Sequence, residues 1–337
     1  MSENIPVFLI AEIGQAHDGS LGMAHAYIDS AAEAGVDAVK FQTHIAEAES
    51  SVHEPFRVQF SYTDATRYDY WKRMEFTPEQ WAGLKKHCAE KRVEFISSPF
   101  SCAAVELLEN LGVQRYKIGS GEISNFLMLE KIARTGKPML LSSGMSSLAE
   151  LDETLSFLKA FGNDLSILQC TTAYPTLPEQ WGLNVIPLLQ KRYSIPVGFS
   201  DHSGDIFACL AAATLGASIL EFHIVFDKKM FGPDAPASLT PAQVKMLVQG
   251  VRKIEASLAQ PVDKQDNSAF LSWKNIFEKS LAVNKHLPAG HLIGIEDLEA
   301  KKPKGYGIPA SHFRETLGKK LARPLDRFDF LRNEDLQ

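Results

Sequence analysis

Two histidines stand at the ends of two consecutive apolar runs: His202 in FSDHSG and His223 in EFH. Imidazole nitrogen is a common ligand of divalent transition metals, and two such ligands leave positions open for a substrate oxygen and a water. The alternative is that each histidine is a buried or catalytic side chain without a metal. If the two runs form neighbouring strands, the histidines lie close together, and a metal site becomes about as plausible as that alternative.

A second group of residues combines amines, an amide and hydroxyls at the ends of such runs: Lys40, Gln42, Lys117, Ser120, Ser142 and Ser200. Groups of this kind donate hydrogen bonds to a phosphate or carboxylate, and those from an amine are charge-assisted. A buried lysine has two alternatives, because it could form a Schiff base with a carbonyl substrate or simply pair with Glu12 or Glu122. Two lysines with three serines favour anion binding over a single amine nucleophile.

Glu12 and Glu122 are carboxylates at the ends of two of these runs. Beside a metal ion, such a group could orient or deprotonate a water or hold a substrate hydroxyl; the alternative is an ion pair with the lysines. Asp234, in the loop FGPDAPASL, could bind a polyol, although an isolated exposed aspartate more often caps a loop. The aromatic and charged residues 60–77 could form a lid or a specificity wall, or pack against a neighbouring subunit.

The elements that must position these residues are eight short apolar runs of strand length: 6–14, 37–43, 93–99, 115–121, 138–144, 165–171, 195–201 and 219–225. Segments with the three- and four-residue apolar spacing of helices separate most of them, for example 77–91 and 148–162. This alternation predicts parallel strands. Eight units in about 260 residues fit one α/β domain, a (β/α)₈ TIM barrel, whose active site lies at the C-terminal ends of the strands.

The pattern changes after the last predicted barrel helix. We predict a TIM-barrel catalytic domain over residues 1–262, a polar linker over 263–280 and a second, small domain over 281–337. The last segment has short strands interrupted by glycine and proline. About 55 residues make a marginal core, so we expect this domain to dock on something larger.

Composition limits the partners and the compartment. The 337 residues carry a net charge of −6, without the basic excess that binding to a nucleic-acid backbone requires. No apolar run approaches the roughly 20 residues that cross a bilayer, and the N-terminal MSENIPVFLIAEIG lacks the features of a secretion signal. We therefore expect a cytoplasmic protein with no nucleic-acid or membrane partner. The four cysteines, Cys88, Cys102, Cys170 and Cys209, are too scattered for a disulfide framework or a zinc site, which predicts buried apolar thiols.

The motifs of this chain, in order, resemble those of the sialic acid synthase family: AEIGQAHDG, DAVKFQT, ISSPF, KIGSGE, LLSSGM, LQCTTAYP, FSDHSG, EFH, FGPDAPASL and KKPKGYGI. The tail resembles the antifreeze-like (SAF) domain of that family. The resemblance implies condensation of phosphoenolpyruvate with an N-acetylated aldose, which gives a nine-carbon 2-keto-3-deoxy acid and phosphate. It also implies a divalent cation, Mn²⁺ first, with Mg²⁺ or Co²⁺ as alternatives. A Schiff-base keto-acid aldolase on the same barrel is the competing interpretation.

The resemblance implies a role for each matching position. His202 and His223 match metal ligands. The phosphoenolpyruvate pocket matches Lys40, Gln42, Ser98, Lys117, Ser120, Ser142 and Ser200, with Phe100 in its wall. Glu12, Glu122, Tyr174 and Asp234 match positions that contact the sugar, the metal-bound water or both. Of the two glutamates, Glu122 is our first candidate for handling the proton of the water, and Glu12 is the second.

Several positions depart from the family pattern. Ala16 and Thr172 stand where asparagine is common, so the sugar end of the site is altered. In KKPKG (residues 301–305, called the arm below), Lys302 replaces an arginine that in the family reaches the partner subunit's pocket and binds the N-acetyl group, and Lys304 replaces a glycine. Lysine lacks the planar fork of arginine. We therefore expect a homodimer whose SAF domain reaches the partner's barrel, and an acceptor of N-acetylmannosamine type or of diacetamido type, as in legionaminic or pseudaminic acid synthesis.

Overall fold

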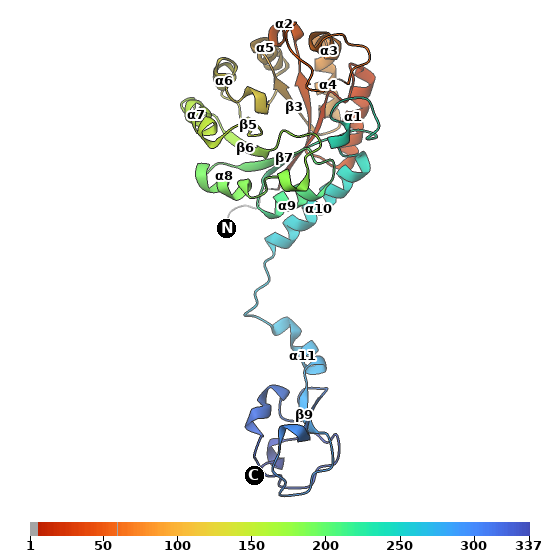
Figure 1. The fold of residues 1–337 in the computed structure, drawn as a ribbon, viewed down its shortest axis with the longest axis vertical. Helices are drawn as coiled ribbons and strands as arrows, with labels where there is room; N and C mark the ends of the chain where they lie inside the picture. The colour runs from red at the N-terminus through yellow and green to blue at the C-terminus, as the bar shows by residue number, and fades with distance from the viewer. Residues whose placement is uncertain (1–5, 59) are drawn as a thin grey trace. The chain divides into compact units, whose positions relative to one another are not determined.

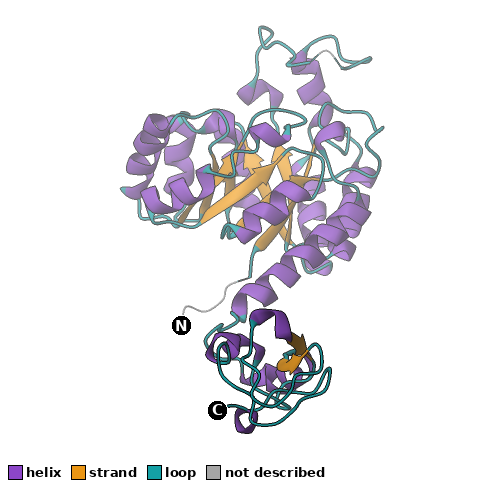
Figure 2. Cartoon of the chain, turned by 60° about the horizontal axis from the view of Figure 1, so that its bottom comes forward, coloured by secondary structure: helices purple, strands orange, loops and turns teal. Residues whose placement is uncertain are grey.

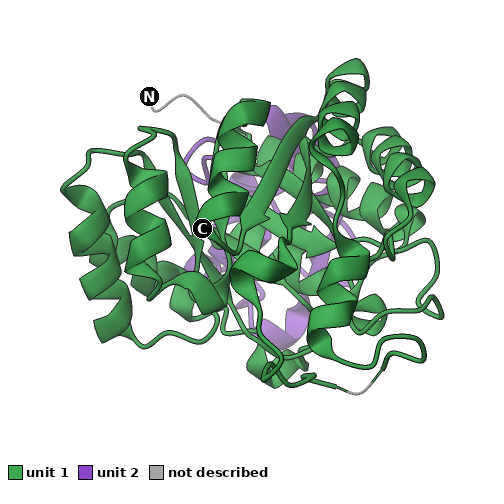
Figure 3. Cartoon of the chain, turned by 90° about the horizontal axis from the view of Figure 1, so that it is seen from above, with its two compact units in different colours: residues 1–260 green, residues 261–337 purple. Residues whose placement is uncertain are grey.

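The computed structural model describes residues 6–58 and 60–337, so residues 1–5 of the N-terminal stretch considered above lie outside it. The chain divides into two compact units, residues 1–260 and residues 261–337 (Figure 3). Each unit is described here by itself. Among the described residues, no helix combines the length and the apolar character needed to cross a bilayer.

The first unit is a closed barrel of eight parallel strands in chain order, with β1 pairing both β2 and β8 (Figure 1). The strands are β1 Phe8–Gly14, β2 Ala38–Thr43, β3 Glu94–Pro99, β4 Tyr116–Ile118, β5 Met139–Ser142, β6 Leu165–Cys170, β7 Val197–Asp201 and β8 Ile219–His223. Each of the eight apolar runs contributes one strand, and the predicted TIM barrel is confirmed.

Helices surround the strands, as Figure 2 shows. They are α1 Leu21–Ala34, α2 Ala46–Glu49, α3 Arg67–Met74, α4 Pro78–Glu90, α5 Cys102–Leu111, α6 Phe126–Ala133, α7 Leu148–Lys159, α8 Val185–Tyr193, α9 Phe207–Thr214 and α10 Pro241–Ala259. Their starts are encoded locally, since Thr77, Ser147 and Thr240 each form a capping box with the residue three positions on, which satisfies free backbone N–H groups. Helices α2 and α3 lie in the long loop between β2 and β3.

The two-residue alternation of each strand decides which side chains enter the barrel. Ile10, Ala38, Ile96, Leu140, Leu168 and Ile219 form one apolar cluster, contributed by six different strands. The outward-facing residues of the same strands, such as Leu220 and Phe222, belong to the larger core that includes the helices. Two residues beyond each member of the inner cluster, the inward position is polar or small. Polar groups therefore form the next layer of side chains inside the barrel, between the apolar cluster and the C-terminal ends of the strands.

The second unit contains the helix α11 Leu271–Phe277 and the antiparallel pair β9 Ser280–Val283 and β10 Leu298–Lys301. Isolated bridges and a small core around Leu281, Leu287 and Leu325 hold its remaining loops. The segment that we predicted to be a plain linker, 263–280, therefore contains a helix and the first residue of β9. The expected small, β-containing C-terminal domain is present.

Candidate functional site

Two buried lysines stand between two buried glutamates inside the barrel. Lys40 Nζ lies 2.7 Å from Glu12 Oε2 and 3.9 Å from Glu221 Oε1, and Lys117 Nζ lies 3.4 Å from the same Glu221 oxygen. At most 5% of each side chain is exposed to solvent. The residues come from β1, β2, β4 and β8, so barrel closure is what brings them together.

Hydroxyl groups complete this charged cluster. Lys40 donates to Ser98 Oγ at 3.3 Å, Lys117 donates to Ser142 Oγ at 2.5 Å, and Ser200 Oγ donates to Glu221 at 3.2 Å. These three serines are all predicted site residues. Glu221 was not predicted, although its position two residues before His223 on one strand places both side chains on the inner face of the barrel.

The cluster keeps Lys40 charged. Burial works against the ammonium of Lys40, but Glu12 and Glu221 outweigh it and raise the pKa of Lys40. Burial likewise opposes the charge of Glu221, yet Lys117 and Lys40 lower its pKa to about 2. For Glu12 burial is the stronger influence and its pKa is raised. The pKa values of the two carboxyl groups are thus shifted in opposite directions. Two lysines beside such a pair form a site that can bind an anion and transfer a proton.

His202 and His223 are neighbours, with ring centroids 5.2 Å apart. His202 Nδ1 lies 3.0 Å from the carbonyl oxygen of Thr171, and the ring of Tyr174 packs against both imidazoles, at 4.1 Å and 5.9 Å between centroids. Burial, reinforced by the nearby charge of Lys40, lowers the pKa of His223 to about 3, so this imidazole is neutral.

The pair fits a divalent cation in most respects. The Thr171 carbonyl at Nδ1 of His202 is the kind of hydrogen bond that would orient a ligating imidazole, and Nε2 would then be the nitrogen that could bind a cation. Burial opposes charge on His202, but the neighbouring Cys170 sulfur and the Thr171 carbonyl raise its pKa to about 9, so a cation would have to displace a proton. No third histidine, cysteine or carboxylate joins the pair in a ligand cluster within the described residues.

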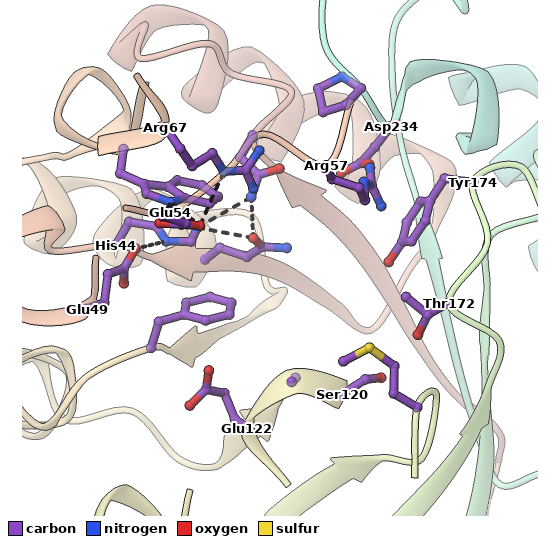
Figure 4. Close-up of a pocket in the computed structure, with 18 residues that line it drawn as sticks. His44, Glu49, Glu54, Arg57, Arg67, Ser120, Glu122, Thr172, Tyr174 and Asp234 are labelled. Carbon is purple, nitrogen blue, oxygen red and sulfur yellow. Dashed lines mark hydrogen bonds and ion pairs between the residues drawn. The ribbon is translucent and has the colours of Figure 1, made fainter. Parts of the chain in front are cut away.

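A pocket of about 410 Å³ opens at this end of the barrel (Figure 4). Its lining contains seven of the predicted residues: Gln42, Phe100, Ser120, Glu122, Thr172, Tyr174 and Asp234. Gln42 Nε2 also donates to Glu12 Oε1 at 2.8 Å, so this side chain connects the pocket to the buried charged cluster. His223 lines a small adjoining cavity together with Asp234.

Glu122 lies apart from the lysine cluster, contrary to one of the two alternatives considered for it. It follows β4 in the short turn Ser120–Glu122, and its Oε2 accepts a hydrogen bond from Asn125 at 2.8 Å. Burial raises the pKa of Glu122. A carboxyl group with a raised pKa at a pocket wall is suited to proton transfer, whereas the ion pair with lysine is made by Glu12 and Glu221.

Family models match both units of this chain. The NeuB family model matches residues 27–263, and the SAF domain model matches residues 278–337. The chain belongs to the NeuB family. It is an enzyme, a synthase of the sialic-acid type, as its motifs led us to expect.

Named relatives of this NeuB-family chain agree with that assignment. It is 35% identical to the N,N'-diacetyllegionaminic acid synthase of Campylobacter jejuni, covering 92% of this chain and 94% of the relative. It is 35% identical to the N-acetylneuraminate-9-phosphate synthase of Homo sapiens, covering 98% and 92%. The solved structure of the N-acetylneuraminic acid synthetase of Leptospira borgpetersenii matches with a TM-score of 0.70 at 29% identity, covering 80% of this chain and 90% of that one.

The wall of this NeuB-family pocket includes residues that sequence reasoning missed. Arg57 Nη2 pairs with Asp234 Oδ1 at 2.8 Å, and its guanidinium lies 4.2 Å from the ring centre of Tyr174. His44 is stacked between Trp71 and Phe100, at 3.8 Å and 4.5 Å between centroids. Asp234 is therefore not the isolated exposed aspartate of the alternative, because it pairs with Arg57 at the pocket wall. That it binds a polyol stays a prediction.

The loop between β2 and β3 supplies much of that wall. Residues 60–77 contribute Arg67 and Trp71, which line the pocket, so this loop forms part of its wall. Packing of the loop against a neighbouring subunit stays a prediction. The preceding sequence THIAEAE, directly after a strand end, was the available signal for His44 and Glu49.

The remaining predicted features lie outside the pocket. Lys302 belongs to the second unit, where its Nζ lies 4.9 Å from the ring centre of Phe277; its contact with a partner's barrel stays a prediction. The expectation of buried thiols is confirmed for Cys88, Cys170 and Cys209 and was wrong for Cys102, which is half-buried. Cys170 also has a polar neighbour, since its Sγ lies 3.9 Å from His202 Nδ1.

Proposed function

We propose that the protein condenses phosphoenolpyruvate with an N-acetylated aldose, either N-acetylmannosamine or a 2,4-diacetamido-trideoxyhexose, to form a nine-carbon 2-keto-3-deoxy acid and phosphate. The observation that supports this best is the pair of buried, charged amines, Lys40 and Lys117, next to a pocket large enough for a sugar. Phosphoenolpyruvate carries two anionic groups on three carbons, and two lysines with serine hydroxyls can bind both.

In the proposed reaction, C3 of phosphoenolpyruvate attacks the aldehyde carbon of the open-chain sugar, and water adds at C2. The C2–O bond then breaks and phosphate leaves, so one water is consumed. Lys40 and Lys117 hold the donor in attack geometry. Glu122 receives the proton of the water, because burial raises its pKa, and Glu12 is the second candidate.

We propose His202 and His223 as ligands of a divalent cation, with Mn²⁺ first and Mg²⁺ or Co²⁺ as alternatives. When bound, such a cation supplies Lewis-acid polarisation of a substrate oxygen. The chain's own contribution is to orient the imidazoles: the Thr171 carbonyl fixes His202, and the Tyr174 ring packs against both.

The Schiff-base aldolase is the weaker candidate. An amine must lose its proton before it attacks a carbonyl, and the contacts of Lys40 with Glu12 and Glu221 raise its pKa. Lys117 is likewise paired with Glu221. Borohydride added to the protein with pyruvate should therefore leave its mass unchanged, whereas a stable adduct on Lys40 or Lys117 would favour the aldolase.

We also propose that the working unit is a cytoplasmic homodimer in which the arm of one subunit reaches the barrel of the other. The second unit has only a small core of its own, and small domains gain stability from docking on a larger partner.

The test is phosphate release from phosphoenolpyruvate in the presence of Mn²⁺ and a panel of N-acetylated aldoses. Phosphoenolpyruvate labelled with oxygen-18 at the bridging position should give labelled phosphate, because the C–O bond breaks. No phosphate with any sugar would contradict the proposed function, and label retained in the organic product would contradict the bond cleavage.

A further inference from the structure

His44 is a buried residue of the pocket wall that has no part in the proposed reaction. It follows β2 directly, and only 3% of its side chain is exposed. Its imidazole is stacked between the rings of Trp71 and Phe100, with interplanar angles of 19° and 12°. Because a ring packs against each face, the plane of the imidazole is held, and hydrogen bonds at its two nitrogens have a fixed direction.

One nitrogen of His44 is paired with a carboxylate. Nδ1 lies 2.6 Å from Oε1 of Glu49, whose side chain is also buried (Figure 4). An ionised carboxylate only accepts hydrogen bonds, so Nδ1 carries a proton and is the donor. The hydrogen bond at one ring nitrogen sets the role of the other. Glu49 therefore leaves Nε2 of His44 to contact the side chains on its other side.

The second nitrogen of His44 faces two side-chain amides. Nε2 lies 3.2 Å from Gln42 Oε1 and 3.3 Å from Gln15 Nε2, and Gln15 Nε2 also donates to Gln42 Oε1. If Nε2 carries a proton, it donates to the oxygen of Gln42. If it carries none, it accepts from one N–H of Gln15 while the other N–H donates to Gln42. In both states the oxygen of the Gln42 amide is turned toward His44 and Gln15, and its nitrogen points away from them.

The orientation of the Gln42 amide matters because its nitrogen faces Glu12. Gln42 Nε2 donates to Glu12 Oε1 at 2.8 Å, and Glu12 Oε2 lies 2.7 Å from Lys40 Nζ. The two ends of an amide have nearly the same shape, so only their hydrogen bonds distinguish them. If the Gln42 amide turned over, its oxygen would face the Glu12 carboxylate, and two acceptors would repel each other. Glu12 would then move from its position beside Lys40.

We propose that His44 is a positioning residue of the condensation, which fixes the side-chain amide of Gln42. Through that amide it holds the Glu12 carboxylate beside Lys40, so that the ammonium keeps the donor in attack geometry. This rests on the proposed function. Although His44 lines the pocket, rings cover both its faces and both its nitrogens have partners within the chain. Its effect on the reaction is therefore exerted through Gln42 and not by contact with a substrate.

The first test measures kcat and KM separately, by phosphate release with phosphoenolpyruvate, Mn²⁺ and the best sugar of the panel. His44→Phe keeps a ring between Trp71 and Phe100 but removes both nitrogens. Because the two lysines still bind the donor, KM for phosphoenolpyruvate should change by less than about threefold, whereas kcat should fall by about tenfold or more. His53→Phe replaces an exposed histidine of the same loop and should change neither. A raised KM with unaltered kcat in His44→Phe would indicate direct substrate binding and overturn the proposal.

Two further variants separate positioning from packing. The amide of glutamine can occupy about the place of the imidazole Nε2, and the shorter side chain of asparagine only that of Nδ1. His44→Gln can therefore still contact Gln42, and it should keep more of kcat than His44→Phe, although it packs less well between the two rings and should unfold at lower urea. His44→Asn should be no more active than His44→Phe. If the activities of the three variants instead follow their stabilities, His44 has a structural role only and the proposal is wrong.

Glu49→Ala tests the same chain of contacts from its other end and serves if the His44 variants do not fold. It removes the acceptor of Nδ1 and leaves the two rings in place, so kcat should fall several-fold with little change in KM. Unaltered kcat in both Glu49→Ala and His44→Phe would overturn this inference and leave the proposed function intact. If the unaltered protein releases no phosphate with any sugar, the proposed function is wrong, and this inference falls with it.

Discussion

The imidazoles of His202 and His223 lie with their centroids 5.2 Å apart, directly after β7 and at the end of β8. These two consecutive strands pair directly, with Ser200 in register with Glu221. The pair, the charged cluster of Lys40 and Lys117, and the pocket thus share one end of the barrel.

Replacing either histidine should remove both metal binding and turnover. We expect His202→Ala and His223→Ala each to lower kcat by about a hundredfold or more, because Lewis-acid stabilisation is worth several kcal/mol. Titration calorimetry with Mn²⁺ should show the loss of binding directly. His25→Ala, on the outer helix α1, is the control and should bind Mn²⁺ normally. Full activity in either barrel variant would exclude that histidine as a ligand.

Replacing one residue of the Lys40–Glu12 ion pair should destabilise the protein more than replacing both residues with apolar ones. Lys40→Met leaves the buried Glu12 without its 2.7 Å partner and should cost about 3 kcal/mol in the free energy of unfolding. The double variant Lys40→Met/Glu12→Leu should recover most of that stability while remaining inactive. Urea unfolding measures the first effect, and phosphate release measures the second. Equal destabilisation in the single and double variants would show that the pair is not coupled.

Gly144 allows two predicted site residues to approach each other. A Cβ atom at this position would lie 2.6 Å from both Ser120 Oγ and Thr172 Oγ1, and the Gly144 N–H donates to Ser120 Oγ at 3.2 Å. Gly144→Ala should therefore displace both hydroxyls and lower kcat/KM by about tenfold or more. Gly83→Ala, in helix α4 with open space around it, should keep full activity and gain up to about 1 kcal/mol of stability. Comparable activities of the two variants would contradict this account.

Acid should destabilise the fold through a buried histidine other than His202 and His223. Burial, with His44 and Arg73 nearby, lowers the pKa of His17 to about 3, against about 6.5 when unfolded. The unfolded state therefore binds the proton first, so the contribution of His17 is complete above pH 6.5 and is lost at about 1.4 kcal/mol per pH unit as pH falls toward 3.

Urea unfolding at pH 7 and pH 5.5 tests this. His17→Gln should show a smaller drop in the free energy of unfolding between the two pH values than the unaltered protein. Substituting the exposed His53 in the same way should leave the drop unchanged. A drop in His17→Gln as large as in the unaltered protein would assign the acid sensitivity to other groups.

The proposed arm exchange predicts recovery of activity in a mixture of two inactive proteins. His202→Ala disables the barrel, and Lys302→Glu disables the arm. Co-refolding both should give mixed dimers with one intact barrel and one intact arm at the same site, and about a quarter of the activity of the unaltered protein for random pairing. Sedimentation should report a dimer. A fully active monomer, or a mixture without recovery, would contradict the exchange.

The barrel and the inner face of its strands could be predicted from the sequence. The alternation of apolar runs and helical segments predicted the closed barrel, and the two-residue period of β8 is enough to place His223 and Ile219 on the inner face. The same period could have identified Glu221. These features are local, because the pleat of a strand and the spacing of a helix follow from neighbouring residues alone.

Tertiary structure decided which charges meet. The sequence offered Glu12 and Glu122 equally as partners of the lysines, but only Glu12 pairs, and Glu221 takes the second position. The pairing of Arg57 with Asp234 joins two loops far apart in the chain. Such contacts depend on barrel closure and on the path of the loops over its mouth, and no periodicity within either segment encodes them.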